Sequence, residues 1–228
     1  MSANPSTTPS DELAALVKLV VHDLRNPAAT VAANVAYVKD VGPGGADDVD
    51  EALEDVEAAL GQLMVGLEQL AWMGQWLGGQ PPLEPGEGDV ALALEGFRGS
   101  RGAFHIEVDV AERPLPARGG NVLPKILEVL FLNASQHARR GTIHVGARRL
   151  GGEVLVEVRD EGPAIDPEDR AQAFTLAGQQ VLKTKANGRY GRVAALFALR
   201  VAIEGLGGRI EADGDDGHAL FRIALPAV

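Results

Sequence analysis

The sequence predicts an α+β protein in which an N-terminal helical hairpin precedes an α/β sandwich. Three observations support this fold class. Apolar residues recur every three or four positions over two long N-terminal segments, a stretch rich in Gly and Pro follows, and strand-like alternation begins after it. We therefore expect a disordered leader at 1–10, a dimerisation hairpin at 11–77, a linker at 78–88 and an α/β sandwich at 89–228.

The first predicted helix begins at Ser10-Asp11 and ends before the glycine-rich loop at 42–45. Its apolar residues are mostly three or four positions apart, so they form one stripe along the helix. The stripe consists of Leu13, Val17, Val20, Leu24, Ala28, Val31, Val35 and Val38.

The second predicted helix has the period of a coiled coil. Two long helices joined by a short loop form an antiparallel hairpin, and a single hairpin would expose much of both apolar stripes. Because pairing two hairpins into a four-helix bundle covers the stripes, we expect a homodimer. Steps of three and four residues alternate through Leu53, Val56, Leu60, Leu63, Leu67, Leu70, Gly74 and Leu77.

Residues 89–228 alternate between helical and strand patterns. The pair Gly151-Gly152 separates two strand-like segments, as in a β-hairpin. The mixture of both patterns favours the α/β sandwich. The predicted helices span 91–97, 123–138 and 193–204, and the predicted strands span 104–110, 143–147, 154–158, 210–212 and 220–225.

The composition excludes several functional classes. The chain has 228 residues and a formal net charge of -11, which disfavours binding to nucleic acid or to an anionic membrane. It contains no cysteine, so disulfides and thiolate metal sites are excluded. No apolar run reaches the roughly 20 residues of a membrane-spanning helix, and residues 1–10 lack the pattern of a signal peptide. We therefore expect a cytoplasmic protein whose partners are proteins or small ligands.

The segment 22–27, with the sequence HDLRNP, has the residue types of a reactive imidazole on a bent helix. A step of two residues turns a helical side chain by roughly 200°, so His22 should face away from the apolar stripe on either side of it. Asp23 can orient the imidazole or accept its proton, as a histidine nucleophile requires. Asn26 lies four positions after the histidine and can border the same surface patch, and the proline that follows bends the helix. These three side chains are the candidate catalytic residues.

The same segment resembles the phosphoacceptor box of two-component histidine kinases at all six positions. Two further motifs follow in the order of that family. Asn133 corresponds to the magnesium-binding residue of the asparagine box, and Asp160 to the aspartate that reads the adenine amino group in the first glycine box. The resemblance implies a hairpin for dimerisation and phosphotransfer, followed by an ATPase-like domain.

Other parts of the nucleotide site also have counterparts. Gly162 belongs to the first glycine box, Phe174 stands at the phenylalanine box, and Gly191 is the first glycine of the second glycine box. The resemblance implies that Asn133, Asp160, Gly162 and Gly191 contact the cofactor, with Asn133 as the metal ligand. ATP and Mg²⁺ are the cofactors that an intact site would use.

Several positions depart from the family pattern. Val129 occupies the place of a second asparagine, one turn before the first, and an apolar side chain cannot bind metal or polarise water. Ala164 replaces a glycine of the first glycine box, and Val193 and Ala195 replace two glycines of the second. Those glycines let backbone N–H groups approach the phosphates, so their loss argues against nucleotide binding. Positive charge for a triphosphate could still come from Lys183, Lys185, Arg189 and Arg192.

The preferred hypothesis is a phosphotransfer protein with little or no use of ATP. His22 would receive phosphate from the aspartate of one response-regulator receiver domain and give it to another.

Three alternatives stay open. The chain could be an active ATP-dependent cytoplasmic histidine kinase, a receiver phosphatase in which Asn26 orients the attacking water, or a dimeric adaptor without chemistry. The sequence therefore leaves its enzyme class undecided.

Overall fold

The structure is a computed structural model that describes residues 9–40, 46–101, 104–135, 141–178, 195–215 and 217–228. Contacts divide the chain into two units, Met1–Leu70 and Ala71–Val228. The first unit holds a helical hairpin and the second an α/β sandwich, so the predicted fold class is confirmed.

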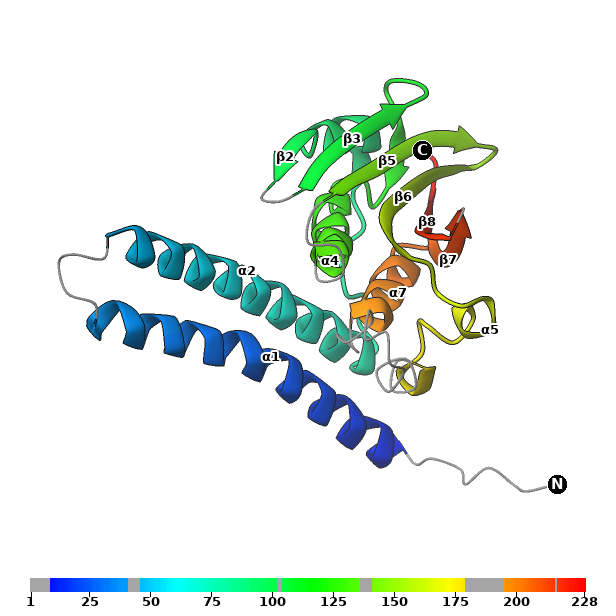
Figure 1. The fold of residues 1–228 in the computed structure, drawn as a ribbon. Helices are drawn as coiled ribbons and strands as arrows, with labels where there is room; N and C mark the ends of the chain where they lie inside the picture. The colour runs from blue at the N-terminus through cyan, green and yellow to red at the C-terminus, as the bar shows by residue number, and fades with distance from the viewer. Residues whose placement is uncertain (1–8, 41–45, 102–103, 136–140, 179–194, 216) are drawn as a thin grey trace. The chain divides into compact units, whose positions relative to one another are not determined.

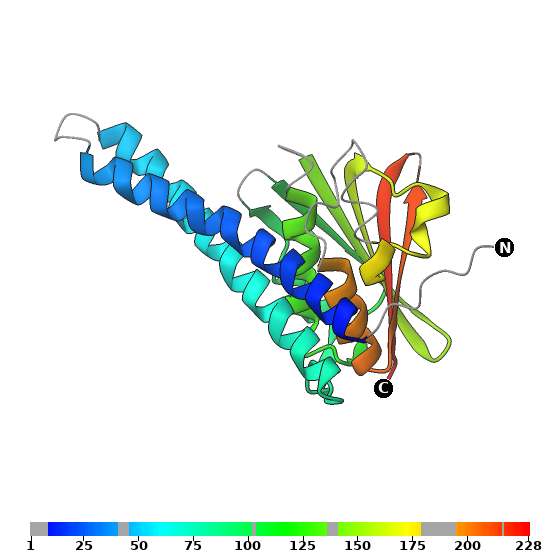
Figure 2. The ribbon, with the colours of Figure 1, turned by 90° about the horizontal axis from the view of Figure 1, so that it is seen from below.

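The hairpin consists of α1 (Pro9–Asp40) and the greater part of α2 (Ala46–Leu77), which run side by side (Figure 1). A second view shows the same pairing along the helices (Figure 2). Val20 on α1 and both Ala52 and Ala59 on α2 are each no more than 6% exposed. The loop predicted at 42–45 lies outside the described residues.

One part of each predicted stripe stays exposed within the first unit. Val17 of the first stripe is 53% exposed and Leu60 of the second is 46% exposed. Met64, which lies outside the predicted stripes, is 66% exposed. The hairpin therefore buries one side of α2 and leaves a second apolar strip uncovered. Among the described side chains of the hairpin, the exposed large apolar residues are Val17, Val21, Val35, Tyr37, Leu53, Leu60, Met64 and Leu67.

The last turns of α2 belong to the second unit. Trp72 and Met73 are buried there, and Trp76 packs edge-on against Phe197 with ring centroids 5.6 Å apart. The boundary between the two units therefore lies within α2, between Leu70 and Ala71, whereas the sequence pattern predicts a linker at 78–88.

The segment predicted as a linker runs along the second unit. The Gly86 N–H donates to Asn121 Oδ1 at 3.2 Å, and the Gly119 N–H donates to the Gly86 carbonyl at 2.7 Å. At its end, β1 (Glu87–Asp89) pairs with β4 (Pro116–Arg118). Hydrogen bonds therefore hold this glycine-rich stretch in place.

The main sheet of the second unit has six strands in the order β2-β3-β5-β6-β8-β7. Neighbouring strands are antiparallel except β3 and β5, which are parallel. The strands are β2 (Gly99–Arg101), β3 (Phe104–Val110), β5 (Gly141–Leu150), β6 (Glu153–Pro163), β7 (Arg209–Asp215) and β8 (His218–Pro226).

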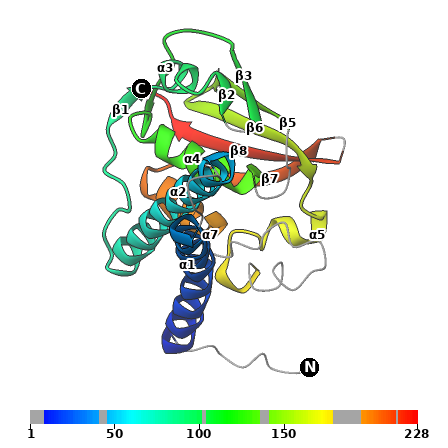
Figure 3. The same ribbon diagram turned by 60° about the vertical axis from the view of Figure 1, so that its left-hand side comes forward.

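Two apolar helices cover one face of this sheet. Figure 3 shows α4 and α7 on the same side of the strands, and the two helices contact each other. Side chains alternate between the faces of a strand, so every second residue of β6 joins the core beneath these helices. The helices of the unit are α3 (Val90–Glu95), α4 (Leu123–Ser135), α5 (Pro167–Arg170) and α7 (Ala195–Gly205).

Most of the predicted elements in 89–228 match observed ones. The strands at 143–147 and 154–158 form β5 and β6 around Gly151-Gly152, and the helix predicted at 123–138 is α4. The sequence did not predict β1, β2 or β4. Each has three residues, too few for a recognisable alternation.

Substitution of Gly120 tests the close contact between the segment predicted as a linker and the segment before α4. A Cβ at this position would lie 2.2 Å from the Gly88 carbonyl oxygen, so backbone would have to move. We expect Gly120→Ala to lower the free energy of unfolding of the second unit by about 2 kcal/mol or more. Urea denaturation followed by tryptophan fluorescence measures this, because both tryptophans lie in that unit.

Gly152→Ala is the matched control, since a Cβ there would meet nothing within 4 Å. Equal urea midpoints for the two variants would contradict the predicted role of the contact.

Candidate functional site

The predicted phosphoacceptor segment lies within α1. His22 and Asp23 belong to this helix, but their side chains lie outside the described residues. Asn26 is exposed, as a group that meets a partner or a water molecule must be. The candidate catalytic residues therefore share one stretch of helix.

Pro27 is buried inside α1. It has no N–H to donate to the carbonyl four residues earlier, so the helix loses one hydrogen bond next to the candidate site. In the next turn, the Thr30 hydroxyl donates to the Asn26 carbonyl at 3.3 Å. Between the helices, Asn34 Nδ2 donates to Asp55 Oδ2 at 3.4 Å. A polar contact thus joins α1 to α2 beyond the candidate site.

The second unit holds the residues predicted to contact a nucleotide. Asp160, near the end of β6, is 4% exposed, and its Oδ1 accepts a hydrogen bond from the Gly162 N–H at 2.7 Å. Its cross-strand neighbour Ile143 is also buried, which places both on the sheet face that α4 covers. The carboxylate therefore holds the turn of the first glycine box while staying almost inaccessible.

Asn133 on α4 is 2% exposed, and its Nδ2 finds no hydrogen-bond partner among the described residues. A buried amide without a partner costs roughly 1–3 kcal/mol. Such a group calls for an explanation, for example a bound ligand or ion.

A buried carboxylate and a buried amide fit a nucleotide with Mg²⁺ in kind, although the Asn133 atom without a partner is Nδ2, a donor that cannot itself bind the metal. Asp160 would hold the adenine base, and Asn133 would offer its amide oxygen to the metal. The bound nucleotide would supply the phosphoryl group. Mg²⁺ beside a nucleotide needs only one or two protein ligands, since phosphates and water complete its shell. Gly191 lies outside the described residues, as do Lys183, Lys185, Arg189 and Arg192.

The departures from the family pattern have structural counterparts in the described residues. Val129 is 2% exposed and belongs to the apolar core. The Ala164 N–H donates to the Gly217 carbonyl at 2.9 Å. Phe174, a position that matches the family pattern, packs edge-on against Phe221. These residues therefore take part in the packing of the domain itself.

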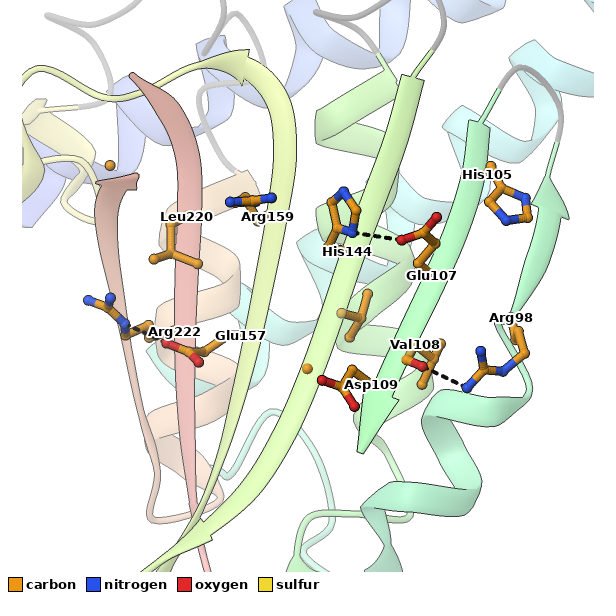
Figure 4. Close-up of a pocket in the computed structure, with 13 residues that line it drawn as sticks. Arg98, His105, Glu107, Val108, Asp109, His144, Glu157, Arg159, Leu220 and Arg222 are labelled. Atoms are coloured by element: carbon orange, nitrogen blue, oxygen red, sulfur yellow. Dashed lines mark hydrogen bonds and ion pairs between the residues drawn. The ribbon is translucent and has the colours of Figure 1, made fainter. Parts of the chain in front are cut away.

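A hollow of about 840 Å³ lies on the other face of the sheet, away from α4 and α7. Figure 4 shows its charged side chains standing in rows across the strands. None of the predicted site residues that the structure describes lines it. Its charged and histidine residues are Arg98, His105, Glu107, Asp109, His144, Glu157, Arg159 and Arg222.

Charges on this face largely pair with one another. His144 Nδ1 lies 3.0 Å from Glu107 Oε2, and Arg222 bonds to both Glu157 at 2.8 Å and Asp213 at 2.5 Å. The Gly214 N–H and the Arg222 guanidinium lower the pKa of Asp213 below its usual value. Cross-strand pairs of this kind stabilise a solvated sheet face, and we assign the hollow no ligand.

Neither a metal cluster nor a membrane span is found in the part of the chain that the structure describes. It contains no group of three or more His, Cys, Asp or Glu side chains placed to hold a metal ion. No helix in it combines the length and apolar character that crossing a bilayer needs.

Comparison of sequences identifies relatives for both parts of the chain. Residues 121–228 match the family of histidine kinase-, DNA gyrase B-, and HSP90-like ATPases. Sensor protein KdpD of Mycobacterium tuberculosis is 29% identical over 224 residues, covering 92% of this chain and 26% of that protein. The chain thus spans about a quarter of the length of this relative.

Comparison of folds gives similar solved structures. Histidine kinase AdeS of Acinetobacter baumannii matches with a TM-score of 0.58 and 20% identity, covering 90% of this chain and 97% of that chain. Full-length ShkA in complex with AMPPNP has a TM-score of 0.54 and 18% identity, covering 97% of this chain and 46% of that chain.

A third match is histidine kinase ThkA in complex with response regulator protein TrrA. It has a TM-score of 0.55 and 14% identity, covering 93% of this chain and 61% of that chain. Residues 121–228 therefore resemble this ATPase family in sequence, and the chain resembles histidine kinases in fold.

Replacing the buried amide tests whether it is unsatisfied in the protein alone. Without added nucleotide, we expect Asn133→Leu to leave the stability of the second unit unchanged or to raise it by about 1 kcal/mol, because an apolar side chain of similar size needs no partner. Urea denaturation followed by tryptophan fluorescence provides the measurement.

Val129→Asn is the reverse control, one turn away at an equally buried position. It should lower stability by roughly 1–3 kcal/mol, because it buries a new amide. A loss of stability in Asn133→Leu would show that the wild-type amide is satisfied.

Proposed function

We propose that this histidine kinase-like chain is a two-component signalling protein that carries phosphate on His22 and exchanges it with response-regulator receiver domains, with little or no use of ATP. The observation that carries the proposal is the contrast between its two candidate sites. The phosphoacceptor segment 22–27 is complete and lies on a long helix of the hairpin. In the second unit, Val129 occupies a core position where the family has a polar residue.

The proposed step is a phosphoryl transfer between two side chains. The bond between phosphorus and the receiver aspartate oxygen breaks, and a bond from phosphorus to a His22 ring nitrogen forms. Asp23 orients the imidazole and takes its proton, and the reverse step returns the phosphoryl group to another receiver. Catalysis of such a transfer rests mainly on positioning and on stabilisation of charge.

The proposal includes a homodimer as the active form of the protein. The uncovered apolar strip on the hairpin, which includes Leu60, Met64 and Leu67, supports this assembly. A second hairpin would bury the strip in a four-helix bundle. The solved complex of ThkA with a response regulator supports a receiver as the partner class.

An ATP-dependent kinase is the second candidate, and the buried pair Asn133 and Asp160 favours it. In that case Asp160 would hold adenine, Asn133 would hold magnesium, and the γ-phosphate would move to His22. A third candidate is a receiver phosphatase, which the exposed Asn26 favours. A dimeric adaptor would bind a receiver without any phosphate transfer.

A transfer assay tests the main proposal. A receiver domain carrying radiolabelled phosphate should pass label to the wild-type chain within minutes, and the label should be acid-labile, as expected for phosphohistidine. His22→Ala should take up none while still binding the receiver. The proposal fails if no cognate receiver labels the wild-type chain.

Two further variants separate the alternatives. If Asn26 acts only in a phosphatase reaction, the Asn26→Ala variant should still take up label on His22. The receiver should then lose its phosphate more slowly with this variant than with the wild-type chain. Labelled ATP with Mg²⁺ should label neither wild type nor Asp160→Asn. Labelling of wild type alone would establish the kinase.

A further inference from the structure

The interior of α2 contains three glycines, Gly61, Gly66 and Gly74. Glycine in a helix interior is unfavourable, because the unfolded chain is more flexible there and no side chain packs. A glycine that is kept in a helix often marks a close approach of another segment. We therefore compare which atoms lie near each of the three glycines.

Only one of the three glycines has a neighbour that alanine would meet. A Cβ built on Gly66 would lie 2.7 Å from Cδ2 and 3.9 Å from Cγ of Leu24. The same Cβ on Gly61 or Gly74 would meet nothing within 4 Å. Gly66 thus forms a notch in α2 that the Leu24 side chain of α1 occupies.

Leu24 is part of the phosphoacceptor segment, two positions after His22 and two before Asn26. On the same helix Val20 and Pro27 are buried, and Leu24 is half-buried. The approach of Leu24 to Gly66 therefore helps to set how α1 lies on α2 along the stretch that carries the candidate chemistry. Any group that pushes Leu24 out of its notch must move this part of α1 or change the Leu24 rotamer.

We infer that Gly66 is a positioning residue for phosphoryl transfer at His22: its missing side chain lets Leu24 seat against α2 and so sets the rotation of α1 at the acceptor. This inference rests on the proposed function. Gly66 touches neither phosphate nor receiver in this role, and it acts only through Leu24. Misplacement of a reacting group by about 1 Å can slow a reaction by roughly 100-fold.

Matched substitutions at Gly66 and Gly61 test the inference in the full chain. Gly66→Ala should slow label transfer from a phosphorylated receiver several-fold, and Gly66→Leu should slow it further. Gly61→Ala and Gly61→Leu, in the same helix, should leave the rate within two-fold of wild type. Receiver affinity, measured separately, should stay the same for Gly66→Ala.

Amide hydrogen exchange of residues 20–30 provides a readout that does not depend on phosphate. Exchange in this stretch should become faster in Gly66→Ala and not in Gly61→Ala. If no receiver labels the wild-type chain, the proposed function fails and the positioning role fails with it, while exchange still shows whether the notch holds α1.

A compensating variant identifies Leu24 as the contact. Leu24→Ala in the Gly66→Ala background removes the clash, so it should restore much of the lost transfer rate and the exchange protection. The inference is overturned if Gly66→Ala behaves like Gly61→Ala in both assays, or if Leu24→Ala restores neither property.

Discussion

Packing of α1 against α2 is the interaction on which the candidate site depends. A helix turns about 100° per residue, so Val20 and Pro27 are buried and Leu24 is half-buried on α1, while Arg25 and Asn26 between them are exposed. The same packing leaves Leu60, Met64 and Leu67 exposed on α2. The side of each helix that is buried thus decides which residues stay exposed. On α1 these include part of the proposed acceptor segment, and on α2 they form the proposed dimer contact.

An apolar core stabilises the second unit. Apolar residues of α4, α7 and the inner sheet face fill this core, and Val129 is one of them. Only Asn133 and Asp160 are buried polar residues among those described in this unit. A domain of this kind can keep its fold after the loss of nucleotide contacts, which agrees with the proposal that it no longer supplies the phosphate.

Much of this architecture could be predicted from the sequence, because it follows from periodic patterns. The spacing in α1 and α2 and the glycine pair at 151–152 gave correct elements. The short strands β1 and β2 carry no pattern, and the burial of Trp72 and the packing of Trp76 against Phe197 in the second unit depend on contacts distant in the sequence. The proposed role of Gly66 could not be predicted from the sequence either, because it depends on a contact with Leu24 of another helix.

The central claim is that the acceptor is intact while the nucleotide site is no longer used. Calorimetric titration of the full chain with a non-hydrolysable ATP analogue and Mg²⁺ tests it most directly. We expect no saturable heat of binding at concentrations up to the millimolar range. Saturable binding that disappears in Asp160→Asn would contradict the claim and identify ATP as a ligand of the second unit.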